Sequence, residues 1–184
     1  MIDDIHILLQ GCIEYDRLSQ EKLYRQLYPA LFALCNKFFD EEDDIVTALN
    51  NGMLRVFNNI EKYNPAKGTL DGWIYSIVRN AAITLVRVKK NQMATEELSY
   101  NLQLETSINP FKDAKEETIL AFLTKLNPAT RAVFNLFYIE GFLIKEIAGS
   151  LDMQEGTVKW HLSEGRNKLK TIFKDNINAR GYAK

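Results

Sequence analysis

The residues best suited to a chemical task lie near the C-terminus, where hydroxyl, amide and basic side chains recur at helical spacing after Glu155 and Gly156. Residues 155–184 contain seven Lys/Arg against three Asp/Glu, although the formal net charge of the chain is −1. Cations of this kind contact phosphates, which positions a protein on nucleic acid without reading its sequence. Arg166, Lys168 and Lys170 are therefore candidates for phosphate contacts on DNA.

Two periodic runs, separated by a break at 152–154, surround these residues. The first run places four apolar residues on one helical face: Ile144, Ile147, Ala148 and Leu151. The second has its inward stripe at Val158, Leu162, Gly165 and Leu169. This layout predicts a helix-turn-helix, whose second helix enters the major groove. An amphipathic terminal helix with a solvated lysine face is the alternative, but Trp160 lies away from the stripe and favours a contact role.

A second basic segment, 70–90, interleaves Trp73 and Tyr75 with cations. Bases stack on aromatic rings while cations follow the phosphates, so this composition suits single-stranded nucleic acid. Core packing is the alternative role for Trp73. The positions expected to face a core are Ile74, Ile77, Val78, Ala81, Leu85 and Val88.

The elements that position these residues are predicted to be helical throughout, since no alternating apolar run is long enough for a sheet. Helices are expected over 4–15, 19–38, about 40–60, 70–90, 112–126 and 128–140, before the helix-turn-helix. Ser19 is the expected cap of the second helix, and Pro29 is expected to kink or break it. The predicted fold is all-α, with two small domains at 1–90 and 112–184 joined by a flexible linker at 91–111.

Composition supports a soluble globular protein, with 46% apolar and 26% charged residues among 184. No run reaches the roughly 18 apolar residues of a membrane span, and the N-terminus lacks a signal-peptide layout. Cys12 and Cys35 are expected to be reduced core thiols, which favours a cytoplasmic protein. The carboxylates at 40–44 are interpreted as a solvated helix start, not a metal site.

Charge is distributed unevenly along the chain. Residues 1–61 contain eleven Asp/Glu against five Lys/Arg, whereas residues 79–90 contain four Lys/Arg and no acid. DNA-binding proteins of high intrinsic affinity are usually basic throughout. Two basic islands in an acidic chain favour a subunit that meets DNA when a larger partner presents it.

Taken together, these segments resemble the extracytoplasmic-function group of bacterial RNA polymerase sigma factors, in the sigma-70 family. The similarity covers nearly the whole chain, and four blocks occur in the family's order. They are residues 11–29, residues 50–63, residues 67–82 (Lys67-Gly-Thr-Leu-Asp-Gly-Trp-Ile-Tyr-Ser-Ile-Val-Arg-Asn-Ala-Ala), and residues 126–148 completed by Glu155-Gly-Thr-Val-Lys and Arg166-Asn-Lys-Leu-Lys.

The resemblance implies a role for each block. The helix at 45–59 is expected to bind the polymerase clamp through Asn50, Asn51, Met53, Leu54 and Arg55. The loop at 63–69 and the helix after it are expected to capture a flipped base of the −10 element and melt it, through Tyr63, Asn64, Lys67, Trp73, Arg79, Asn80 and Arg87. The residues expected at the duplex −35 element are Thr157, Lys159, Trp160, His161, Ser163, Arg166 and Lys168.

The resemblance also implies an initiation factor with no catalytic chemistry, cofactor, metal or membrane contact of its own. Its expected partners are core RNA polymerase, promoter DNA and an anti-sigma factor. The sequence departs from the family at Asn50 and Asn51, at Ser76, at Trp160, which replaces a small residue, and at Glu164, where a base is usual. Glu164 could accept from a cytosine amino group, but surface exposure is the preferred interpretation.

Two other functions remain open from the sequence. One is a stand-alone helix-turn-helix regulator that binds its operator as a dimer, and the other is a sigma-like regulator that no longer melts promoters. An enzyme is least favoured, because His6 and His161 have no Ser, Cys or paired carboxylate at a catalytic spacing.

Overall fold

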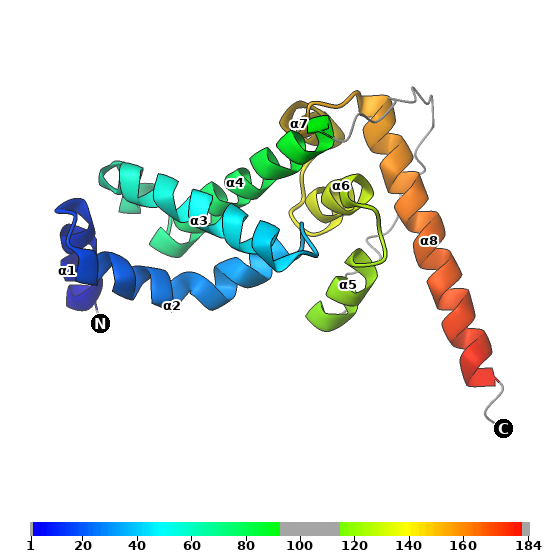
Figure 1. Ribbon diagram of the computed structural model, residues 1–184, viewed down its shortest axis with the longest axis horizontal. Coiled ribbons are helices and arrows are strands. Elements are labelled where there is room, and N and C mark those ends of the chain that lie inside the picture. The colour runs from blue at the N-terminus through cyan, green and yellow to red at the C-terminus, as the bar shows by residue number, and fades with distance from the viewer. Residues whose placement is uncertain (1, 93–114, 182–184) are drawn as a thin grey trace. The chain divides into compact units, whose positions relative to one another are not determined.

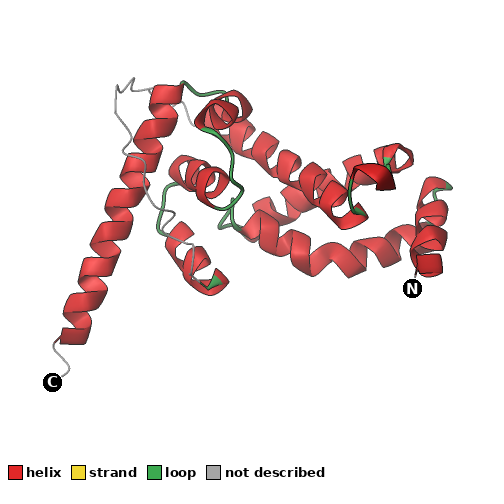
Figure 2. Ribbon diagram, turned by 180° about the vertical axis from the view of Figure 1, so that it is seen from behind, coloured by secondary structure: helices red, strands yellow, loops and turns green. Residues whose placement is uncertain are grey.

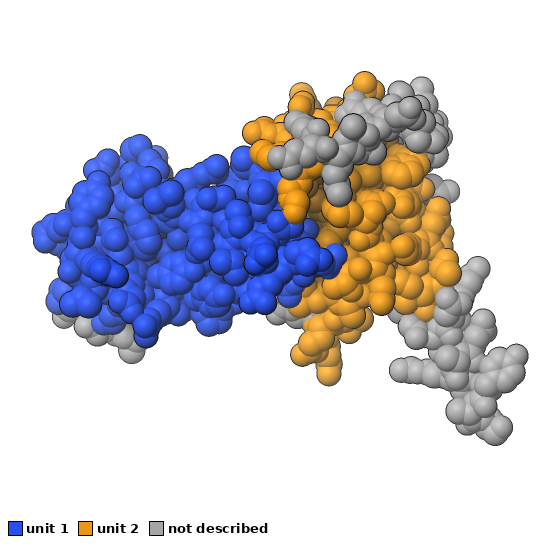
Figure 3. All heavy atoms as spheres, viewed as in Figure 1, with its two compact units in different colours: residues 1–85 blue, residues 86–184 orange. Residues whose placement is uncertain are grey.

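The computed structural model describes residues 2–92 and 115–181, and all regular structure within these ranges is helical (Figure 2). The chain divides into two compact units, residues 1–85 and 86–184 (Figure 3). The all-α prediction is therefore confirmed. The predicted linker at 91–111 lies outside the described residues, apart from its first two, which belong to a helix.

In unit 1, α1 (Ile2–Ile13) turns directly into α2 (Arg17–Asn36) (Figure 1). Asp16 caps α2, because its carboxylate accepts the Ser19 backbone N–H at 2.8 Å and the Ser19 hydroxyl at 2.6 Å. The prediction that Ser19 is the cap was wrong by three residues, since a carboxylate one turn earlier takes that role. α2 also continues through Pro29 without a break.

α3 (Glu42–Asn59) begins with Glu42, Asp43 and Asp44, where carboxylates complement the helix dipole. Two 3-10 turns, η1 (Ile60–Lys62) and η2 (Pro65–Lys67), lead to α4 (Leu70–Gln92). α3 passes very close to α4 at Gly52, where an added Cβ would lie 2.7 Å from the Val78 Cα. Glycine is needed there because a backbone atom cannot move aside.

The core of unit 1 comes from one face of each of these helices. Its fully buried side chains include Leu34, Leu49, Met53, Ile74 and Val78. The predicted stripe of α4 is correct at Ile74, Val78 and Ala81, which are buried, whereas Ile77 and Leu85 are partly buried and Val88 is 45% exposed. Val88 lies on the predicted face at 3.6 residues per turn, so its exposure reflects where core packing ends along the helix and not the spacing.

Unit 2 contains α5 (Glu116–Leu123), α6 (Pro128–Tyr138), α7 (Ile144–Leu151) and α8 (Glu155–Gly181). Asn127 caps α6 and Pro128 occupies its first turn, a favoured combination at a helix start. α6 packs against both α7 and α8. The inward stripe predicted for α8 is confirmed, since Val158, Leu162, Gly165 and Leu169 are all buried.

Candidate nucleic-acid and polymerase interfaces

α7 and α8 form a helix-turn-helix with a turn of three residues. Asp152 adopts the left-handed conformation (φ 53°, ψ 58°) that ends α7, and its N–H donates to the Ala148 carbonyl. At the start of α7, the Glu146 carboxylate accepts the Leu143 N–H at 2.8 Å. The first bond closes the turn between the two helices and the second caps the start of α7, and together the helices give the helix-turn-helix that the sequence pattern predicted.

The outward face of α8 carries part of the predicted DNA-binding set. Lys159, Trp160 and Ser163 are partly exposed, and Lys168 is exposed, as is the neighbouring Asn167. Thr157 and His161 are instead 9% and 7% exposed. These two residues flank the apolar stripe, and the buried arc of α8 is wide enough to include them.

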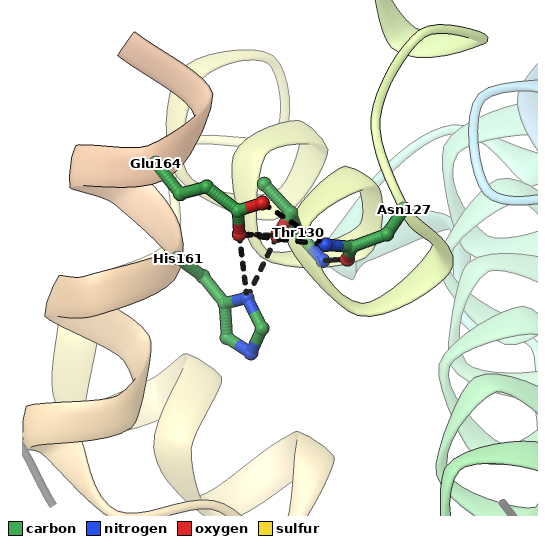
Figure 4. A network of polar contacts seen from close by, with 4 residues as sticks. All are labelled: Asn127, Thr130, His161 and Glu164. Atoms are coloured by element: carbon green, nitrogen blue, oxygen red, sulfur yellow. Dashed lines mark hydrogen bonds and ion pairs between the residues drawn. The ribbon is translucent and has the colours of Figure 1, made fainter. Parts of the chain in front are cut away.

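His161 and Glu164 of α8 meet the first turn of α6 in a polar network (Figure 4). The Thr130 hydroxyl donates to Glu164 Oε2 at 2.7 Å, and the Thr130 Oγ1 atom itself lies 2.8 Å from His161 Nδ1. Asn127 Nδ2 donates to Glu164 Oε1 at 3.2 Å, while its Oδ1 caps α6 by accepting the Thr130 N–H. Glu164 thus bonds across to α6, and the interpretation of it as a simple surface residue was incomplete.

The hydrogen bonds of this network determine which ring nitrogen of His161 carries the proton. The Thr130 hydroxyl has one proton, which the Glu164 carboxylate accepts, so its oxygen must accept from His161 Nδ1–H. Burial lowers the pKa of His161 to about 4, against a smaller opposing effect of Glu164 and a smaller reinforcing effect of Lys90. His161 is therefore a neutral packing residue near pH 7, protonated at Nδ1.

Arg166, which was predicted to contact a phosphate, also has a partner on α6. Its Nε donates to the Tyr138 hydroxyl at 2.6 Å, and its guanidinium carbon lies 5.9 Å from the centroid of that ring. Beside it, Gly165 lies against Phe134, where an added Cβ would be 2.5 Å from the ring. α8 is thus bonded to both ends of α6 and packed closely at its middle.

In unit 1, the loop at 63–69 is organised by bonds within itself. The Tyr63 hydroxyl donates to the Gly68 carbonyl at 3.1 Å, and Asn64 Oδ1 accepts the Ala66 N–H at 2.9 Å. The Tyr63 and Trp73 rings lie 5.7 Å apart between centroids, tilted by 50°. The structure therefore brings an aromatic pair together across the loop, which also contains the exposed Lys67.

The remaining residues of the predicted −10 site lie further along α4. Asn80 and Arg87 are exposed and Arg79 is partly buried. Ser76 donates through its hydroxyl to the Trp73 carbonyl at 2.7 Å, which bonds it to its own helix. Trp73 is only partly buried, so core packing does not account for the whole indole.

On α3, four of the five predicted polymerase-binding residues are exposed. Asn50, Asn51, Leu54 and Arg55 lie at the surface, with Leu54 59% exposed, whereas Met53 is 2% exposed and belongs to the core. Asn50 Oδ1 also accepts the Tyr24 hydroxyl of α2 at 2.8 Å.

Sequence reasoning missed the residues that hold these surfaces in place from other helices. They are Tyr24 on α2 and Asn127, Thr130 and Tyr138 at α6. The Asn-Pro pair before α6 signals a helix cap. Nothing in the local sequence signals a bond to a residue 37 positions later.

Two kinds of feature are absent from the described residues. Within 2–92 and 115–181, no three His, Cys, Asp or Glu residues group in a way that could hold a metal ion. Over the same part of the chain, no helix combines the length and apolar character needed to cross a membrane.

The fold and the surfaces define a class of protein: an all-helical chain of two units, the second of which presents a helix-turn-helix. Comparison with protein families is more specific. Residues 23–92 match sigma-70 region 2, and residues 116–169 match sigma-70 region 4. The chain belongs to the sigma-70 family, within its extracytoplasmic-function group, which confirms the resemblance noted in the sequence.

Two sequence relatives agree with this assignment. The chain is 28% identical over 158 residues to the ECF RNA polymerase sigma factor SigE of Mycolicibacterium smegmatis, covering 83% of this chain and 60% of SigE. It is 23% identical over 132 residues to the ECF RNA polymerase sigma factor SigM of Bacillus subtilis, covering 71% of this chain and 80% of SigM. A solved structure of sigma factor RpoE with anti-sigma factor NepR from Bartonella quintana is similar at 18% identity, with 84% and 96% coverage and a TM-score of 0.45.

Proposed function

We propose that this protein is an extracytoplasmic-function sigma factor that binds core RNA polymerase and directs it to promoters for transcription initiation. The observation that carries the proposal is the presence of both sigma-70 regions in one chain and in this order. Region 2 covers α2 to α4, and region 4 covers α5 and the helix-turn-helix. A stand-alone operator-binding regulator has no need of region 2.

The polymerase-binding surface is the exposed face of α3. Asn50, Asn51, Leu54 and Arg55 supply an apolar centre with polar neighbours, which is the usual composition of a protein interface. The buried Met53 supports this face from below. Residues 1–61 carry a net negative charge, so this surface differs in charge from the basic segments proposed to bind DNA.

The −10 element is proposed to bind at the loop 63–69 and the first turns of α4. The Tyr63–Trp73 pair offers a ring surface for a base, and Lys67, Asn80 and Arg87 are exposed for phosphates and base edges. A base leaving a duplex costs a few kcal/mol of unstacking, which stacking on such rings can offset.

The −35 element is proposed to meet the outward face of α8. Lys159, Trp160 and Ser163 lie on its first turns, where a recognition helix contacts base edges, and Lys168 follows for phosphate. Thr157 and His161 are assigned packing roles because they are buried. Arg166 contacts phosphate only with the part of its guanidinium that Tyr138 leaves available.

An anti-sigma factor is the further protein partner that we propose, on the ground of family membership. The exposed face of α3 and the outward face of α8 are the surfaces that such a regulator has to cover. Covering either one prevents promoter-directed initiation.

The test of the whole proposal is co-purification with bacterial core RNA polymerase, followed by transcription from a promoter library. Stable binding with new start sites is the expected result. Binding without transcripts would indicate a sigma-like regulator that does not melt DNA, and salt-sensitive affinity for duplex DNA without polymerase binding would indicate a stand-alone regulator.

Two substitutions refine this experiment. Leu54→Ala is expected to weaken polymerase binding about tenfold, the effect of losing a partly buried Leu contact. Leu18→Ala is the matched control, since Leu18 is 75% exposed on α2. Trp73→Ala is expected to reduce permanganate-detected promoter opening more than polymerase binding, and an equal loss of both would contradict its role in melting.

A further inference from the structure

The first three turns of α8 contain very few charged side chains that could hydrogen-bond to the edge of a base. Between residues 155 and 165, Lys159 is the only Lys or Arg. The acid at Glu164 is occupied by Thr130 and Asn127 of α6. Besides Lys159, the partly exposed side chains on these turns include Trp160 and Ser163.

The polar network sets the rotation of α8 about its own axis. His161 and Glu164 are three residues apart, so they lie on one side of the helix, and both bond to the hydroxyl of Thr130. The close packing of Gly165 on the Phe134 ring sets the distance between the two helices. With rotation and distance both fixed, the direction of each outward Cα–Cβ bond on these turns is fixed as well.

Trp160 is connected to this network through its neighbour. The indole and the His161 imidazole lie edge to face, with 4.8 Å between ring centroids and 69° between planes. His161 is neutral and its Nδ1–H is bonded to Thr130, so its ring has one orientation in which to support the indole. Trp160 remains partly exposed on the outward side of α8.

We infer that Trp160 is a specificity-determining residue that contacts a thymine methyl group in the −35 element, and that Thr130 and Glu164 are positioning residues that orient it. In the major groove, the thymine C5-methyl is the apolar feature that distinguishes the bases, and an apolar side chain is what recognises it. The inference rests on the proposed function, because it requires α8 to lie in a promoter.

The test replaces each thymine of the −35 element by uracil, which removes only the methyl group. The full chain is used with core RNA polymerase, and binding is measured on the promoter identified in the library. The expected result is about a fourfold loss at one thymine, the effect of one methylene-sized apolar contact. Trp160→Ala is expected to remove this sensitivity, and Trp160→Phe to retain part of it.

The positioning role is tested by a pair of substitutions at one residue. Thr130→Val removes the hydroxyl with little change of shape and is expected to abolish the thymine-to-uracil ratio, whereas Thr130→Ser retains the hydroxyl and the ratio. Thr171→Val is the control, because that exposed hydroxyl donates to the Asn167 carbonyl of its own helix. A merely structural role would lower affinity for both DNAs equally.

The outcomes separate this inference from the proposed function. Transcription with no uracil sensitivity at any −35 position overturns the inference and leaves the sigma-factor function intact. Uracil sensitivity that persists in Trp160→Ala also overturns it. Failure to bind polymerase at all contradicts the proposed function itself.

Discussion

The two regions proposed to bind DNA are held in place in different ways. In unit 1, the side-chain bonds of the loop at 63–69 join residues two to five positions apart, as between Tyr63 and Gly68. In unit 2, the bonds that hold α8 join residues 28 to 37 positions apart, as between Tyr138 and Arg166. One surface is organised locally and the other by its tertiary partner.

This difference matches the two proposed tasks. A loop whose side-chain bonds join residues close in sequence can rearrange with little disturbance of the core, which suits the capture of a base leaving a duplex. A helix that reads a groove needs a fixed rotation, because a small turn about its axis moves every side chain relative to the base edges. The long-range bonds of Thr130 and Tyr138 supply that rigidity.

The largest expected effect comes from adding a methyl group where α8 packs closely on α6. Gly165→Ala places a Cβ 2.5 Å from the Phe134 ring and is expected to cost about 3 kcal/mol through overpacking. Hydrogen exchange should then show faster opening of α6 and α8 with α2 and α3 unchanged. Gly149→Ala on α7 is the control, since no atom of the described residues lies within 4 Å of an added Cβ and the alanine should be neutral or stabilising. Equal effects of the two substitutions would contradict the packing argument.

A dependence on pH is expected in unit 2 because of His161. Its folded pKa of about 4 lies below the unfolded value, so the unfolded state binds a proton first as the pH falls. The stabilisation is complete above the unfolded pKa of about 6.5 and is lost between that pH and about 4, by about 3 kcal/mol at most. Glu164 opposes this shift of pKa and Lys90 adds to it.

Amide exchange of α8 at pH 7 and pH 4.5 measures this dependence. His161→Gln should show a smaller change between the two pH values than the unsubstituted protein. His6→Gln, which changes the other histidine of the chain, should leave it unaltered. A change of the same size in all three proteins would assign the effect to carboxylates.

A smaller and strictly local effect is expected in the loop of unit 1. Gly68 has φ 151°, a conformation that other residues adopt at a cost of about 1–3 kcal/mol, although no atom in the described part of the chain lies within 4 Å of an added Cβ. Gly68→Ala should therefore alter the loop and weaken promoter opening, with polymerase binding retained. Permanganate reactivity and polymerase co-purification measure the two properties separately, and a parallel loss would show that the loop is not independent of the core.

The smallest changes in stability are expected from removing two asparagine caps, one in each unit. Asn127→Ala removes the cap of α6 and one partner of Glu164, and should destabilise unit 2 by about 1 kcal/mol. Asn64→Ala removes a cap inside the loop of unit 1 and should leave global stability nearly unchanged. Chemical denaturation followed by exchange in each unit decides between them. A larger effect at Asn64 would reverse the contrast drawn between the two regions.

The sequence by itself determined the helices, the helix-turn-helix and the family. Helices and motifs depend on the spacing of residues that are close in sequence, as with the apolar stripe from Val158 to Leu169. That spacing can be read directly from the sequence. The aromatic and basic residues of the two segments proposed to bind DNA, 70–90 and 155–184, could also be recognised from the sequence. The prediction that Ser19 caps α2 was wrong because two capping residues compete within one turn.

Only the tertiary structure decided which flanking residues of α8 turn inward. A helical pattern gives the direction of the buried stripe but not its width, which depends on the helix packed against it. α6 covers the flank that holds His161, and its first turn supplies the donors for Glu164. Glu164 stands where the family usually has a base. In the folded protein its carboxylate accepts a hydrogen bond from Thr130, 34 residues earlier, because the first turn of α6 packs beside it.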